Sequence, residues 1–197
     1  MNWRRHHGPA PRWSSVPGWY LALLAVTGAQ RLQEIAISRR RERGIQGRRA
    51  AGRSYPLMVA AHMALFALPP LEVAVLRRRP RAPLLWIGLL AGATALRLWS
   101  IRSLGRHWNV RAVVPSDLRP VETGPYRWIR HPNYLAVVLE FLALPLAGGA
   151  WLSALGLSAL DAAVLADRIR DEERLLAEAP GYEQAFGTKA RFIPGLF

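Results

Sequence analysis

The sequence predicts an all-α integral membrane protein, a helical bundle of about five transmembrane helices in which the last two form a tight hairpin. Hydrophobic residues make up 51% of the 197 residues, they gather into long runs, and the basic residues lie between those runs. Cysteine is absent, which excludes disulfides, iron–sulfur clusters and thiolate nucleophiles. We expect one membrane domain over residues 1–197, with three spans in 1–101 and a second half in 102–197.

Three long apolar runs come first, at residues 18–37, 55–76 and 83–101. Each is close to the roughly 20 residues that a helix needs to cross a hydrocarbon core. Two shorter runs, at 133–147 and 150–166, are separated by Gly148-Gly149. One helix over both would be too long for a single span, so the glycines predict a turn between two helices. The Arg- and Gly-rich segment 39–53 is predicted to be a loop.

The net charge of +14 has a topological interpretation. With five spans, 18 Lys and Arg residues lie on the side of the first loop, the third loop and the C-terminus, and seven on the other side. The positive-inside rule then places the more basic side in the cytoplasm, where it also attracts anionic membrane lipid. We expect no nucleic-acid partner, because such a surface gathers its charge on one face with aromatic platforms. The five histidines lack paired spacing, so no metal site is expected.

The segment 103–135 is dense in polar, aromatic and proline residues, directly beside an apolar run. Gly124-Pro125 predicts a turn, and His131-Pro132 predicts a helix start, because proline tolerates the first helical position. The free N–H groups at a helix start favour an anion, and Arg127 and Arg130 add positive charge. The sequence therefore predicts a carboxylate or phosphate site here.

A second polar feature follows the last apolar run. Ile169 and Leu176 are seven residues apart, so they share a helix face, and Glu172 and Glu173 lie on that same face. At least one carboxylate is therefore expected to point toward the protein interior. The alternative is a solvated helix end with the ion pairs Arg168–Glu172 and Arg170–Glu173, each worth about 0.2–0.5 kcal/mol.

These pieces resemble the isoprenylcysteine carboxyl methyltransferase family over residues 97–197. The resemblance rests on Gly-Pro-Tyr-Arg, Arg-His-Pro-x-Tyr, the hydrophobic hairpin, Arg-x-x-x-Glu-Glu, Gly181-Tyr182 and the Arg-Phe-Ile-Pro of residues 191–194. It implies an all-helical membrane fold that uses S-adenosyl-L-methionine, and a cofactor pocket at the cytoplasmic face. Ala136 stands where the eukaryotic prenylcysteine enzymes usually carry glycine. The segment is closer to bacterial relatives, which implies a multi-pass protein of the bacterial inner membrane.

The resemblance predicts an O-methyltransferase that acts on a carboxylate or hydroxyl of a lipophilic substrate. The helix start at Pro132, with Arg127 or Arg130, suits the cofactor carboxylate, and the two glutamates suit its ammonium or ribose hydroxyls. Trp108, Tyr126, Trp128 or Tyr134 would stack on adenine or face the cation. The predicted cofactor-binding residues are His107, Trp108, Tyr126, Arg127, His131, Pro132, Tyr134, Glu172 and Glu173.

Two residues are predicted to be catalytic. Arg130 would orient a carboxylate acceptor, which needs no base, and Glu140 would serve as the base for a phenol or enol. Because an unpaired acid within a membrane is costly, the alternative for Glu140 is an ion pair with Arg97 or Arg31. Gly88-x-x-x-Gly92 offers a close helix contact within or between chains, so a homo-oligomer is possible.

Two other functions compete with the methyltransferase. The segment His-Pro-Asn-Tyr-Leu is similar to one in sterol reductases, which would make the chain an NADPH-dependent membrane reductase, but Glu172-Glu173 favours the methyltransferase. A non-enzymatic membrane protein with basic, lipid-binding loops is the third candidate. That function leaves the polar cluster of 124–134 and the inward glutamates unexplained.

Overall fold

The computed structural model describes residues 12–43, 47–49, 54–115 and 119–193. The long helices in this part of the chain are α1 (Gly18–Glu42), α2 (Ser54–Leu76), α3 (Pro83–Leu104), α4 (Pro132–Gly148) and α5 (Trp151–Ala177). The short elements are η1 (Trp13–Ser15), β1 (Gly47–Arg49), η2 (Gly105–His107), β2 (Val113–Pro115), η3 (Gly124–Arg127) and α6 (Tyr182–Phe186).

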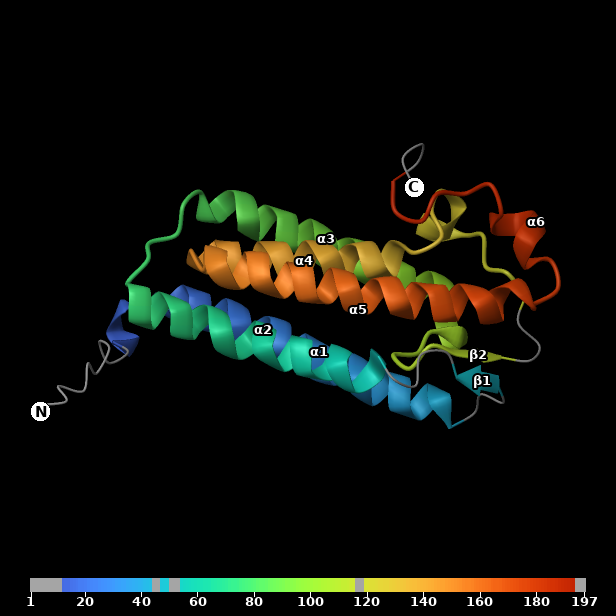
Figure 1. Ribbon diagram of the computed structural model, residues 1–197, viewed down its shortest axis with the longest axis horizontal. Coiled ribbons are helices and arrows are strands. Elements are labelled where there is room, and N and C mark those ends of the chain that lie inside the picture. Colours follow the sequence, from blue (N-terminus) through green and yellow to red (C-terminus); the bar gives the residue numbers. More distant parts are fainter. Residues whose placement is uncertain (1–11, 44–46, 50–53, 116–118, 194–197) are drawn as a thin grey trace, which may run out of the picture.

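All five apolar runs form helices, which confirms the helical bundle. The helices lie lengthwise along the molecule, and β1, β2, η2, η3 and α6 gather at one end (Figure 1). α2 and α3 are long and apolar enough to cross a membrane, and α4 is apolar but shorter. The count of five spans stays a prediction.

The hairpin predicted at Gly148-Gly149 is confirmed. Gly149 adopts a left-handed conformation with φ of 88°, and a Cβ there would lie 3.0 Å from the backbone of Arg79, so glycine suits both the turn and the close approach. Glu72 of α2 caps the N-terminus of α5, because its carboxylate accepts hydrogen bonds from the backbone N–H groups of Leu152 and Ser153. The two short runs are therefore antiparallel neighbours.

One predicted boundary was wrong. The expected loop of residues 39–53 includes the last turn of α1. The arginines in this turn stabilise the helix, because positive charge interacts favourably with a helix C-terminus. The expected loop also includes β1, which pairs antiparallel with β2 in the register Arg48 opposite Val114. The last helix continues beyond its apolar run to Ala177, which agrees with the helix face that Ile169 and Leu176 were predicted to share.

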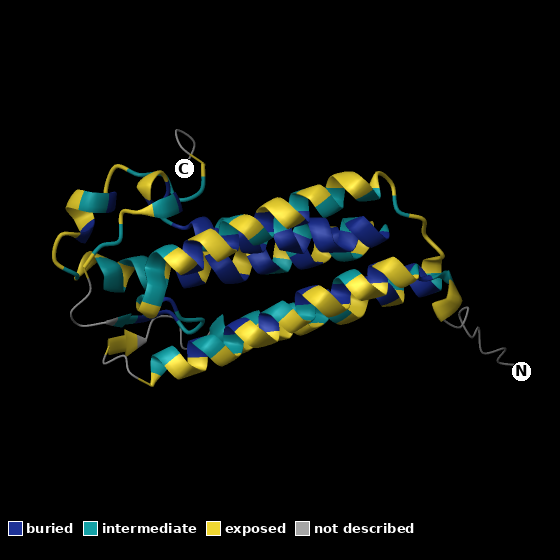
Figure 2. Cartoon of the chain, turned by 180° about the vertical axis from the view of Figure 1, so that it is seen from behind, coloured by how far each residue is buried: buried dark blue, intermediate teal, exposed yellow. Residues whose placement is uncertain are grey.

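The core lies between the inward faces of the long helices. Tyr20, Leu65, Val73, Phe141 and Leu144 are fully buried there. Figure 2 shows buried residues on the facing sides of the helices and exposed ones outside. Many of these outward residues are large and apolar, which is the arrangement a lipid environment favours.

Candidate functional site

A cavity of about 170 Å³ lies where the long helices meet the short elements. Its walls come from α2 through α6, together with η2, β2 and η3, so residues far apart in the sequence share it. Its polar and aromatic lining comprises His62, Arg97, His107, Trp108, Asn109, Tyr126, Arg130, His131, Asn133, Tyr134, Arg168, Glu172, Tyr182 and Phe186. Its apolar lining includes Met58, Val137 and Leu165.

The helix start is formed as predicted, and the C-terminal tail holds it. Pro132 is the first residue of α4, and the carbonyl of His131 accepts hydrogen bonds from the N–H groups of Tyr134 and Leu135, both at 3.1 Å. The N–H groups of Arg130 and His131 donate to the carbonyls of Ala190 (2.9 Å) and Arg191 (3.0 Å). The segment before α4 is thereby fixed on both sides.

The predicted meeting of the helix start with the acidic pair is confirmed by two contacts. The first joins His131 Nε2 to Glu173 Oε1 at 3.0 Å. Glu173 also accepts hydrogen bonds from Arg191, whose Nη2 lies 2.6 Å from Oε2, and it pairs with Arg130 Nη1 at 3.4 Å. Burial alone would raise the pKa of Glu173, but these hydrogen bonds and charges outweigh it and lower the pKa to about 2. Glu173 therefore stays ionised and orients Arg130 and His131.

The second contact joins Tyr134 to Glu172, because the Tyr134 hydroxyl donates a hydrogen bond to the Glu172 carboxylate. Nε of Arg168 donates to the same hydroxyl at 2.8 Å, and its Nη2 donates to the carbonyl of Val110. Arg168 is only 2% exposed. The alternative ion pairs of a solvated helix end, Arg168–Glu172 and Arg170–Glu173, do not form: Arg168 is buried, and Arg170 pairs with Asp167 instead.

Four buried polar atoms of cavity residues lack a hydrogen-bond partner within the described part of the chain. They are Arg97 Nη1, Arg130 Nε, Asn133 Oδ1 and Arg168 Nη1. Buried polar groups are normally hydrogen-bonded, and each exception requires an explanation. Three donors and one acceptor around one cavity are the groups that would bind an anionic, hydroxyl-rich or amino-bearing ligand.

Seven of the predicted site residues line the cavity: His107, Trp108, Tyr126, Arg130, His131, Tyr134 and Glu172. Pro132 starts the helix, and Glu173 acts through its neighbours. The sequence left Arg127 and Arg130 as alternatives, and the structure favours Arg130. Arg127 is exposed, and its guanidinium lies 5.9 Å from the ring centroid of Trp128. Trp128 is itself half exposed and packs edge-on against Trp99, away from the cavity lining.

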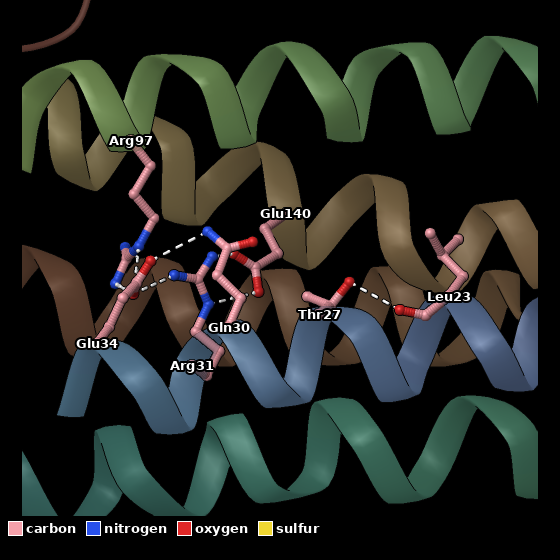
Figure 3. A network of polar contacts seen from close by, with 7 residues as sticks. All are labelled: Leu23, Thr27, Gln30, Arg31, Glu34, Arg97 and Glu140. Carbon is pink, nitrogen blue, oxygen red and sulfur yellow. Dashed lines mark hydrogen bonds and ion pairs between the residues drawn. The ribbon is translucent and has the colours of Figure 1, made fainter. Parts of the chain in front are cut away.

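Glu140 does not line the cavity, so its position does not support the predicted role as a base. Arg31 Nε donates to Glu140 Oε1 at 3.0 Å, and Nη2 pairs with Oε2 (Figure 3). This is one of the two ion pairs that the sequence left open. A carboxylate buried between helices needs such a partner to remain charged, and α1 supplies it.

Sequence reasoning assigned no site role to Asn133, Arg168 and Arg191, and considered Arg97 merely as an ion-pair partner. Asn133 follows the proline of the helix start directly, and Arg168 lies four residues before Glu172, on the same face. Those spacings could have indicated both residues. The role of Arg191 depends on the tail lying against residues 130 and 131, which no local pattern reveals.

Comparisons with known proteins agree with this geometry. The sequence model of the isoprenylcysteine carboxyl methyltransferase (ICMT) family matches residues 86–178. This segment extends from α3 through α5 and contains most of the polar cavity residues. The uncharacterized protein YpbQ of Bacillus subtilis (strain 168) is 34% identical over 162 residues, which cover 79% of this chain and 95% of that protein.

Proposed function

The chain belongs to the isoprenylcysteine carboxyl methyltransferase family, and on this premise we propose that it transfers a methyl group from S-adenosyl-L-methionine to an oxygen of a lipophilic acceptor. The observation that carries the proposal is the set of four cavity-lining residues that each keep one buried polar atom without a partner in the described part of the chain. The cofactor has a carboxylate, an ammonium group and ribose hydroxyls. These groups would satisfy three of the four atoms in one binding event: the donors on Arg130 and Arg168 and the acceptor on Asn133. The fourth atom, on Arg97, is left for the methyl acceptor.

The residues at the helix start would hold the amino-acid end of the cofactor. Arg130, oriented by Glu173, would bind the carboxylate, and Asn133 Oδ1 and Glu172 would accept hydrogen bonds from the ammonium or the ribose hydroxyls. Trp108 and Tyr126 line the same cavity and would offer aromatic faces to adenine or to the sulfonium. When bound, the cofactor supplies the electrophilic methyl group.

The acceptor would occupy the side of the cavity toward Arg97. Its lipophilic part would contact Met58, Val137 and Leu165, and its oxygen would approach the unpartnered Nη1 of Arg97. Methyl transfer to a carboxylate needs no base, so the contribution of these residues is orientation and exclusion of water. A lipid-soluble acceptor is consistent with a cavity among helices whose outer faces are apolar.

We place the cavity on the cytoplasmic side of the bacterial inner membrane, in a multi-pass topology. In the structure, the end of α1, the segment between α3 and α4, and the end of α5 gather at the cavity end (Figure 1). These are the more basic parts of the sequence, and the positive-inside rule assigns them to the cytoplasm.

Calorimetry on the purified protein in detergent tests the proposal. S-adenosyl-L-methionine is expected to bind and NADPH is not, and labelled methyl groups should then pass to a component of a bacterial lipid extract. Binding of NADPH alone would support the reductase, and binding of neither ligand would support the non-enzymatic function. Either result would overturn the proposal.

A further inference from the structure

Four charged side chains form a buried network between three helices (Figure 3). Arg31 and Glu34 come from α1, Arg97 from α3 and Glu140 from α4, and each is at most 8% exposed. Arg31 bridges the two carboxylates: it binds Glu140 through Nε and Nη2, and Glu34 through Nη1. With two positive and two negative groups, the network is neutral, which limits the cost of burying it.

Glu34 contacts Arg97 on one side of the guanidinium. Arg97 Nε donates to Glu34 Oε2 at 2.8 Å, and Nη2 lies 2.8 Å from the same oxygen. Glu34 is itself held, because its other oxygen accepts a hydrogen bond from Gln30 Nε2 at 3.1 Å. These contacts leave Arg97 Nη1 buried without a partner in the described part of the chain, on a residue that lines the cavity.

We propose that Glu34 is a positioning residue, which fixes the Arg97 guanidinium so that Nη1 remains available to an anionic oxygen of the acceptor. An unrestrained arginine has four flexible side-chain bonds and would lose orientational entropy on binding, whereas the clamped one has already lost it. Glu34 lies in α1, outside the segment 86–178 that the family model matches. The inference rests on the proposed function, because that function assigns the Arg97 side of the cavity to the methyl acceptor.

The test is equilibrium binding of an S-isoprenyl-N-acetylcysteine and of its methyl ester, each measured with the cofactor present. Wild type should bind the acid about tenfold or more tightly than the ester. Glu34→Gln should remove most of that preference and change cofactor affinity less than about twofold. In an Arg97→Gln background, Glu34→Gln should have no further effect, because residues that act through one another are not additive.

Glu140→Gln is the matched control, since it makes the same substitution in the same network at a carboxylate that binds Arg31 and not Arg97. It should preserve the preference for the acid. Should Glu34→Gln not fold, the double variant Arg31→Gln/Glu34→Gln keeps the network neutral and should lose the preference as well.

Equal effects of Glu34→Gln and Glu140→Gln would overturn the inference, as would additive effects of Glu34→Gln and Arg97→Gln or a wild type that binds acid and ester alike. Failure of the proposed function gives a different result. In that case the cofactor does not bind, while the preference for the acid still depends on Glu34 through Arg97. That result would support the anion site at Arg97 and refute the methyltransferase function.

Discussion

His131 Nε2 lies 3.0 Å from Glu173 Oε1, a contact that joins the start of α4 to the charged end of α5. The two residues are 42 positions apart in the chain. The contact exists because the hairpin at Gly149 returns α5 along α4 and brings its charged end beside the helix start. Glu173 then gathers Arg130 and Arg191 around the same carboxylate, so one acid connects the helix start, the end of α5 and the C-terminal tail.

The first prediction concerns the pH dependence of stability at Glu173. Its pKa of about 2 in the folded protein lies below the ordinary value, so its stabilising contribution is complete above about pH 4.5 and is lost as the pH falls toward 2. Glu173→Gln should lower stability at neutral pH by on the order of 1 kcal/mol, and the difference from wild type should shrink in acid. Thermal unfolding in detergent from pH 7 to pH 3 measures it.

The control for that experiment is Glu183→Gln, at an exposed position of α6. It should change the melting temperature little at any pH. A Glu173→Gln protein that is as stable as wild type at pH 7 would contradict the prediction.

The second prediction separates two neighbouring arginines. Arg130→Ala should weaken binding of S-adenosyl-L-methionine roughly 10- to 100-fold, because a charge-assisted hydrogen bond contributes about 1.5–3 kcal/mol. Arg127→Ala, which removes an exposed guanidinium outside the cavity lining, should leave the Kd within about twofold. Calorimetry gives both values, and a larger effect at Arg127 would refute the assignment.

The third prediction concerns the Tyr134 hydroxyl, which links Arg168 to Glu172. Tyr134→Phe leaves Arg168 Nε buried without this acceptor, so we expect a stability loss of about 1–3 kcal/mol and roughly tenfold weaker cofactor binding. Tyr20→Phe makes the same change at a buried hydroxyl that has no hydrogen-bond partner among the described residues. It should leave cofactor binding unchanged and stability equal or slightly higher. Equal changes in stability and in cofactor affinity in the two variants would contradict the proposed role of the Tyr134 hydroxyl.

The fourth prediction concerns packing at the hairpin. A Cβ on Gly148 would lie 2.3 Å from ring atoms of Tyr20, a residue that is fully buried. Gly148→Ala should therefore destabilise the protein by about 1–3 kcal/mol. In α5, a Cβ on Gly156 would have no atom within 4 Å, so Gly156→Ala should raise stability by up to about 1 kcal/mol through helix propensity. Differential scanning fluorimetry of both variants would reveal the opposite signs.

Much of the bundle followed from local pattern. The apolar runs became helices within a few residues at most ends, because in an apolar environment the backbone must satisfy its own hydrogen bonds. The exception was the end of α1, where charged residues continue the helix beyond the apolar run. The charged end of α5 also continues the helix, but the spacing of Ile169 and Leu176 predicted it. The extended end of α1 contacts the segment between η2 and β2, where the Val110 N–H donates a hydrogen bond to the Ser38 hydroxyl. Hydropathy does not encode such a contact.

The candidate site was predicted in part. Proline at a helix start and glutamates on one helix face are local signals, and both pointed to residues that meet in space. The choice between Arg127 and Arg130 required the turn of η3, which exposes one and turns the other toward Glu173. The inward orientation of Arg168 required the Tyr134 hydroxyl and the Val110 carbonyl.

By itself, the sequence determined which segments are helices, where the chain turns back at Gly148-Gly149, and which two polar segments form the candidate site. These features depend on neighbours within a few residues. The tertiary structure decided which charge faces which. Arg31 and Glu140 are 109 residues apart. A buried carboxylate pairs with the cation that helix packing brings within hydrogen-bond distance, and no local sequence pattern specifies that cation. Glu140 therefore pairs with Arg31 outside the cavity lining, whereas Arg97 lines the cavity and keeps one buried nitrogen without a partner among the described residues.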